Sequence, residues 1–126
     1  MMIFLMIAAA AAEVVPADRA AILDAAHHAI ARRIGKTPRL LVRTLGHQGE
    51  WVFLVATMQD AAGRPISYAG TPLASAAAEG MISKDYVALF RRSGAGWRVI
   101  EEALGPTDVA WSGWAEKHGA PKAIFG

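Results

Sequence analysis

Two tryptophans near the C-terminus, Trp111 and Trp114, form the most suggestive group of side chains, together with Asp108 before them and His118 after them. Indole rings pack against apolar groups, and polar neighbours orient a bound molecule. These four residues are therefore the candidate binding site, for a glycan, a peptide or a partner protein. The competing interpretation, which weighs more, is that both indoles pack the terminal segment onto a sheet, because tryptophan is largely buried on average.

The histidines and paired carboxylates do not make a catalytic or metal-binding group. His27 and His28 are neighbours on a predicted helix, about 100° apart around its axis, so they cannot face one metal ion as an i, i+4 pair can. Glu101 and Glu102 are neighbours on a predicted strand and point to opposite faces. We expect His27 beside the apolar stripe and His28 in solvent. One glutamate should lie on the helix-covered side of the sheet and the other in solvent.

Nucleophile and cofactor motifs are missing from the sequence. The chain contains no cysteine, which excludes thiol catalysis, disulfides and Cys-based zinc sites. Its serines lie in no nucleophile elbow or SxxK context, and its glycines form neither a phosphate loop nor a dinucleotide-binding fingerprint. The sequence therefore predicts no catalytic residue, no metal site and no cofactor.

The charge pattern argues against nucleic-acid binding. Thirteen Lys and Arg residues are interspersed with eleven Asp and Glu residues, which gives a net charge of +2 in 126 residues. A nucleic-acid surface needs a concentrated basic patch. Arg32–Arg33 is explained by the last turn of a helix, where cations complement the dipole, and Arg91–Arg92 by a solvated hairpin end.

The first twelve residues, Met1–Ala12, are uncharged and apolar. The run is shorter than the ~20 residues of a membrane-spanning helix, and alanines at 10–12 suit a signal peptidase. We predict a signal peptide over 1–12 and a single domain over 13–126 that is periplasmic or secreted, with no stable membrane span after cleavage. Because no Lys or Arg precedes the run, the alternatives are an apolar N-terminal strand or a longer signal hidden by a wrongly assigned start.

A long helix is predicted at the start of the domain. Pro16 suits its first turn, Asp18 complements the positive end of its dipole, and Gly35 ends it. Apolar residues recur on one face at spacings of three and four, namely Ile22, Leu23, Ala26, Ile30 and Ile34. This stripe must pack against another element.

Strands come after the helix. Residues 40–45 and 51–58 form a first pair around a four-residue turn at 46–49, and the second strand is apolar on both faces, as in a central strand. A helical turn over residues 73–78 interrupts the otherwise irregular segment 66–83.

A second hairpin, built around the glycine-bearing turn at 93–96, is the clearest prediction. Pairing about that turn places Phe90 opposite Val99 and Leu89 opposite Ile100. Its strands are residues 85–92 and 97–104. Alternation sorts the apolar side chains by face, with Tyr86, Ala88, Phe90, Trp97 and Val99 on one and Val87, Leu89, Ile100 and Leu104 on the other.

This order of elements predicts an α+β fold. Sequential strands joined by short turns pair antiparallel, and an amphipathic helix covers one face of the resulting sheet. We therefore expect one long N-terminal helix packed on a four-stranded antiparallel sheet. A short C-terminal helix, capped by Thr107 or Asp108, should complete the domain.

Several segments together resemble a family of small exported proteobacterial proteins that have no established activity. The matching segments are residues 51–60, 63–66, 87–92, 96–101, 105–111, Trp114 and 119–121. The resemblance implies an exported protein of unknown function. The layout is also similar to cystatin-like and NTF2-like folds, where a helix lies across a curved antiparallel sheet; that similarity is one of topology and implies no function.

The sequence leaves three hypotheses for function. The leading one is a non-enzymatic periplasmic binding or interaction module, whose partner is an envelope protein, a peptide or a glycan. The second is a small NTF2-like enzyme with Asp108, Glu101 or a histidine in a pocket between helix and sheet. The third is a structural accessory of an envelope complex. A polar cavity under the helix favours the enzyme, whereas a filled core with an exposed tryptophan favours the binding module.

Overall fold

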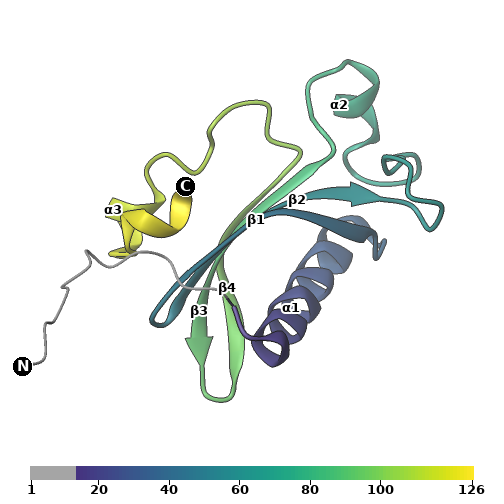
Figure 1. Cartoon of the computed structure of the whole chain (residues 1–126). Helices are drawn as coiled ribbons and strands as arrows, with labels where there is room; N and C mark the ends of the chain where they lie inside the picture. Colours follow the sequence, from purple (N-terminus) through teal and green to yellow (C-terminus); the bar gives the residue numbers. More distant parts are fainter. Residues whose placement is uncertain (1–13) are drawn as a thin grey trace, which may run out of the picture.

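The computed structural model describes residues 14–126, so the predicted signal peptide lies outside the described residues. The elements are α1 (Pro16–Ile34), β1 (Arg39–Gln48), β2 (Trp51–Gln59), α2 (Ala74–Ala78), β3 (Asp85–Ser93), β4 (Gly96–Leu104), α3 (Trp114–His118) and the 3₁₀-helix η1 (Lys122–Phe125). The strands pair antiparallel with their sequence neighbours, in the order β1-β2-β3-β4. α1 covers one face of the sheet, and the C-terminal segment (residues 106–126) packs on the other (Figure 1). The predicted α+β fold is confirmed.

α1 forms as its sequence predicts. Pro16 is its first residue, and Gly35 ends it at φ +69° while donating its N–H to the Ala31 carbonyl at 2.8 Å. Arg32 and Arg33 lie in the last turn. The buried face turns toward the sheet and consists of Ile22, Ala26, Ala29, Ile30 and Ile34. None of the helices within residues 14–126 is long and apolar enough to cross a membrane.

The first hairpin turns later than predicted. β1 continues to Gln48, so the turn consists of Gly49 and Glu50 alone, with Gly49 at φ +59°. Gly46 is a strand residue instead of a turn residue. An ideal Cβ at Gly46 would lie 2.8 Å from the carbonyl carbon of Ile124 and 2.9 Å from its Cα. Glycine is needed there because the C-terminal segment crosses β1 backbone against backbone.

The second hairpin matches the predicted pairing at its tip and departs from it further along. Phe90 pairs with Val99, but Leu89 pairs with Glu101, because β4 contains one extra residue between the two. A bulge of this kind reverses the alternation of the strand beyond it. Leu104, predicted on the face opposite Phe90, therefore packs with the core beneath α1.

The long connection between β2 and β3 is held by Tyr68. Its side chain is buried, and its hydroxyl donates to the Ser83 carbonyl at 2.6 Å. Burial raises the pKa of Tyr68 to about 12. The helical turn predicted at 73–78 is present as α2, and Gly80 comes after it at φ +69°. The connection is irregular in secondary structure but packed by its own side chains.

The C-terminal helix begins later than predicted. α3 starts at Trp114, and Thr107 and Asp108 lie exposed in the preceding loop, where neither caps a helix. Pairing of the second hairpin extends to Gly105, whose N–H donates to the Asp85 carbonyl at 2.7 Å. From that point the chain must pass back over the sheet before it can form a helix on the uncovered face (Figure 1).

Candidate functional site

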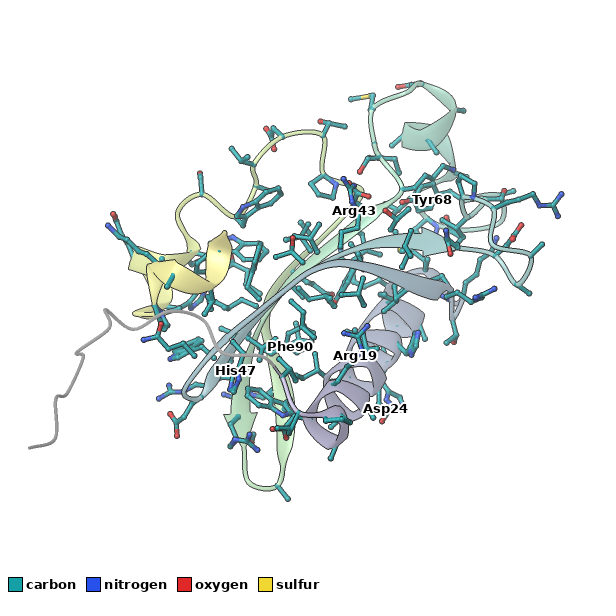
Figure 2. The ribbon with its side chains drawn as sticks, in the orientation of Figure 1. Arg19, Asp24, Arg43, His47, Tyr68 and Phe90 are labelled. Carbon is teal, nitrogen blue, oxygen red and sulfur yellow. The ribbon has the colours of Figure 1, made fainter. Side chains whose placement is uncertain are left out.

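The helix-side core, between α1 and the sheet, is filled by apolar side chains. Phe90 points from β3 toward α1 (Figure 2) and is fully buried. The other members with no exposed surface are Ile22, Ala26, Ile30, Val52, Leu54, Ala56, Met58, Tyr86 and Ala88. The space in which the enzyme hypothesis requires a polar pocket is thus occupied by these side chains.

Glu102 provides the polar group at the edge of the helix-side core. The Tyr86 hydroxyl donates to it at 2.5 Å, and Arg33 of α1 donates to its other oxygen at 3.3 Å. Burial, together with this hydrogen bond, raises the pKa of Tyr86 above its ordinary value. Glu102 thus lies on the helix-covered side, as expected for one glutamate of the pair. The arrangement joins helix to sheet and gives the buried hydroxyl a partner.

The second basic pair is more than a solvated hairpin end. Arg92 donates to Asp18 in the first turn of α1 at 3.0 Å, and its guanidinium lies 4.4 Å from the centroid of the Trp97 ring. The Trp97 indole N–H also donates to Asp18, at 3.3 Å. These two hydrogen bonds, the one from Arg92 being stronger, lower the pKa of Asp18. Arg91 faces the opposite way and pairs with Glu50 at 3.3 Å.

A smaller, C-terminal-side core fills part of the other sheet face around Phe53 of β2. Phe53 is 1% exposed. The ring centroids around it are those of Phe125 at 4.6 Å, Trp111 at 5.9 Å and Trp114 at 6.4 Å. Three aromatic residues of the C-terminal segment therefore converge on a single strand residue.

The outer surface of the C-terminal segment carries a groove of about 430 Å³, which we call the aromatic groove. Its lining residues are Val109, Trp111, Ser112, Ala115, Glu116, Lys122 and Phe125. Trp111 and Phe125 are partly buried, and both rest on Phe53, which fixes the orientation of their rings. Val109 is 60% exposed, so a large apolar side chain faces water at the groove. An oppositely charged pair of exposed residues, Glu116 and Lys122, completes the lining.

The four residues predicted as a binding site take different places. Trp111 lines the aromatic groove. Trp114 is 5% exposed and packs in the C-terminal-side core. His118 contacts Glu101 of β4, Asp108 is exposed in the loop, and neither residue is part of the groove lining. The structure brings Trp111 together with partners that the sequence had not singled out.

Glu101 binds the C-terminal segment to the sheet. One of its carboxylate oxygens lies 2.6 Å from Lys117 Nζ and 3.0 Å from His118 Nε2. The hydrogen bond from Lys117, and to a smaller extent that from His118, lowers the pKa of Glu101. The expectation that the second glutamate faces solvent is wrong, because α3 covers that face and supplies both partners.

Of the groove lining, the predicted site contained Trp111 and missed Val109, Ser112, Ala115, Glu116, Lys122 and Phe125. Phe125 belongs to the apolar tail after Pro121, and that tail was the one available signal. The others are scattered side chains, most of them exposed, which acquire a common location only when the segment folds over Phe53.

The histidines contribute no metal site within the described part of the chain. His27 is partly buried and His28 is exposed, as predicted, and His28 Nδ1 lies 3.0 Å from the Asp24 carbonyl oxygen. Among residues 14–126 no group of three His, Cys, Asp or Glu side chains is placed to hold a metal ion.

Comparisons with protein-family models, curated proteins and solved structures found no match to this chain. The resemblance to small exported proteins, and the similarity in topology to cystatin-like and NTF2-like folds, therefore stay predictions. A function for this protein must accordingly be argued from the geometry of its described residues.

Proposed function

We propose that this protein is an exported, non-enzymatic binding module that holds a peptide segment of an envelope protein in the aromatic groove. The observation that carries the proposal is the groove itself, about 430 Å³ in volume and bounded by two aromatic side chains that stand on the buried Phe53. This volume falls within the range of roughly 300–1,000 Å³ typical of ligand sites. An exposed apolar side chain beside oriented rings is the arrangement of a binding surface.

The lining favours a peptide over a glycan. Val109, Trp111 and Phe125 present apolar surface suited to one or two apolar side chains of a ligand. The Glu116 carboxylate can accept hydrogen bonds from main-chain N–H groups of the bound peptide, and the Lys122 ammonium can donate to its main-chain carbonyl groups. A sugar ring carries hydroxyl groups around its whole edge and needs a denser set of polar partners than these residues provide.

Export is part of the proposal and rests on residues 1–12. The apolar run and the alanines before Glu13 favour cleavage by a signal peptidase, which places the domain in the periplasm or outside the cell. Cell fractionation and mass spectrometry of the recovered protein test this. We expect the exported form to begin at or near Glu13, and a cytoplasmic protein of full length would contradict it.

The two other hypotheses have less support. An NTF2-like enzyme needs a polar pocket between helix and sheet, where fully buried apolar side chains such as Leu54 and Phe90 lie. Glu102 is close to that region, but its two oxygens already accept hydrogen bonds from Tyr86 and Arg33. A purely structural accessory has no need of a preformed groove with oriented rings.

The test is selection of a peptide and then measurement of its binding to a matched pair of variants. Random phage-displayed peptides are selected on the purified protein, and the binding of the best synthetic peptide is measured by calorimetry. We expect a consensus with an aromatic or branched apolar residue. Val109→Glu should weaken binding by about tenfold or more, because the bound peptide would desolvate the new carboxylate.

The control variant is Met81→Glu. Met81 is 62% exposed and lies outside the groove, so this variant makes the same change of charge without touching the lining. Both variants should keep the wild-type unfolding free energy to within about 0.5 kcal/mol. Failure to enrich any peptide, or equal binding by the wild type and the Val109 variant, would overturn the proposal. Binding of the protein to a glycan array, with no peptide selected, would show that the ligand is a sugar and not a peptide.

A further inference from the structure

A second groove, of about 360 Å³, lies at the opposite end of α1 from Asp18, and we call it the basic groove. It is bounded by the connection after α1, the start of β1, the end of β2 and the loop after β2. These parts of the chain meet at one end of the molecule (Figure 1). The lining residues that carry polar or charged side chains are Lys36, Thr37, Arg39, Gln59, Asp60 and Ser67.

The two cations of this groove contact backbone carbonyl groups and have no carboxylate partner among the described residues. Lys36 Nζ donates to the Ser67 carbonyl at 2.8 Å, and Arg39 Nη1 donates to the Ala61 carbonyl at 3.3 Å. A carbonyl accepts a hydrogen bond without cancelling the charge. An ammonium has three donors and a guanidinium five, so each side chain keeps further donors for a ligand.

The carboxylate of Asp60, the single acid in the lining, is already satisfied. It accepts hydrogen bonds from the backbone N–H groups of Ala62 and Arg64, both at 2.9 Å, and from Arg64 Nε at 3.3 Å. The backbone hydrogen bond from Arg64 is the main cause of the lowered pKa of Asp60. Since Arg64 compensates Asp60, the charges of Lys36 and Arg39 remain uncompensated in the groove.

The backbone of the loop is closed by its own hydrogen bonds. Asp60 donates its N–H to the Arg64 carbonyl at 2.7 Å, and Ile66 donates its N–H to the Met58 carbonyl at 3.1 Å. The buried side chain of Ile66 holds the far end of the loop in the domain. The groove therefore exists before any ligand arrives, which lowers the cost of binding.

We propose that the basic groove binds a phosphate group, held by Lys36 and Arg39 and carried either by a soluble ligand or by an anionic membrane lipid. Guanidinium and ammonium groups with free donors are the side chains that bind phosphate oxygens in proteins. The hydroxyls of Thr37 and Ser67 and the Gln59 amide can donate to the remaining oxygens. This site is independent of the aromatic groove. The competing explanation is that Lys36 and Arg39 only hold the loop in place.

The test is a titration of the ¹⁵N-labelled protein with inorganic phosphate, monitored by amide chemical shifts, at an ionic strength kept constant with chloride. Constant ionic strength removes the general screening of surface charge. We expect saturable shifts confined to residues 36–39 and 59–67. Lys36→Met and Arg39→Gln should each weaken the phosphate affinity by about tenfold.

Two control variants separate binding from general charge and from holding the loop. Arg19→Gln removes one positive charge from an exposed site on the first turns of α1 and should leave the affinity unchanged. Lys84→Met removes a cation that holds the same loop, through the Ile66 carbonyl at 2.6 Å, but does not line the groove. It should lower the melting temperature and keep the phosphate shifts. Equal shifts in the wild type and the Lys36 and Arg39 variants, or shifts spread over all basic residues, would overturn the proposal.

The source of the phosphate group is decided with vesicles. Sedimentation with vesicles of phosphatidylglycerol and phosphatidylcholine, compared with phosphatidylcholine alone, measures binding to a lipid phosphate. Binding that is lost in the Lys36 and Arg39 variants but kept in the Arg19 variant assigns the groove to an anionic lipid. Groove shifts with free phosphate and no such vesicle binding assign it to a soluble phosphorylated ligand.

Discussion

The two faces of the sheet are covered by different means. The helix-side core lies under a 19-residue helix whose apolar stripe is continuous, and ten of its side chains have no exposed surface. The C-terminal-side core lies under the five-residue α3 and the four-residue η1, which are joined by a short connection. Both faces meet in β2, where Leu54 points to one core and Phe53 to the other.

This difference explains where a binding surface can form. A long amphipathic helix buries a wide stripe and closes the face beneath it. Two short helical elements can only cover Phe53 and its neighbours, so Trp111 and Phe125 each keep an edge in solvent. The face with the weaker cover therefore carries the aromatic groove, and we expect the face with the stronger cover to supply most of the stability.

The largest expected effect comes from removing one phenylalanine from each core. Phe90→Ala, on the helix side, should lower the free energy of unfolding by about 3–5 kcal/mol, because α1 cannot close the cavity. Phe53→Ala should cost less, near the low end of that range, because the short C-terminal elements can move inward. Urea unfolding monitored by circular dichroism measures both. A cost for Phe53→Ala equal to or above that for Phe90→Ala would break the proposed contrast between the cores.

A middle-sized effect is expected at the crossing of β1 and the C-terminal segment. Gly46→Ala would place a Cβ against the Ile124 backbone, and relief of that overlap should cost about 1–3 kcal/mol. Gly96→Ala is the control, since its Cβ would meet only the Ser93 carbonyl oxygen, at an ordinary 3.9 Å, and its φ is not positive. That control should change stability by less than about 0.5 kcal/mol. Gly46→Ala should also abolish peptide binding, and a neutral Gly46→Ala would show that the segment packs on β1 only loosely.

The smallest expected effect is the acid sensitivity of two carboxylates, one on each side of the sheet. Asp18 and Glu101 both have pKa values below their ordinary values of 3.8 and 4.5. A lowered folded-state pKa gives stability that is present above the ordinary value and is lost as the pH falls through the lower folded value. Asp18→Asn and Glu101→Gln should therefore lower the melting temperature at pH 7 and flatten its decline between about pH 5 and pH 3.

The two carboxylate variants also separate the two faces. Glu101→Gln weakens the contacts with Lys117 and His118 and should reduce peptide binding, whereas Asp18→Asn should leave peptide binding intact. Melting curves at several pH values measure the stability of each variant, and one calorimetric titration per variant measures its peptide binding. Wild-type and Glu101→Gln curves that stay parallel down to pH 3 would show that the Glu101 contacts contribute nothing to holding the segment.

Local patterns predicted most of the fold. Pro16 and Gly35 bounded α1 correctly because proline and glycine act through the backbone of their own turn. The second hairpin was found from its glycine-bearing turn and the apolar runs beside it. β2 was recognised as a central strand because its side chains are apolar at both odd and even positions.

Three departures from prediction depend on how strands and segments pair in the folded chain, which no local pattern in the sequence reports. Gly46 was assigned to a turn, but it lies in β1, where only glycine leaves room for the backbone of Ile124. Leu104 was assigned to the wrong face because the bulge before it depends on pairing with β3. One glutamate of the 101–102 pair was expected in solvent, and this expectation fails at Glu101 because no local pattern places Lys117 and His118 over it.

The sequence by itself determined the order of elements, the antiparallel sheet and the apolar character of both its faces, since these depend on periodicity and turn residues within short windows. Trp111 was also selected from the sequence, as one member of a candidate binding site. Only the tertiary structure decided that Trp114 is packing while Trp111 lines a groove, because the burial of each indole depends on how the C-terminal segment folds over Phe53. The same holds for the basic groove, because Lys36 contacts the Ser67 carbonyl, 31 residues further along the chain, and Arg39 contacts the Ala61 carbonyl only when β1 has paired with β2.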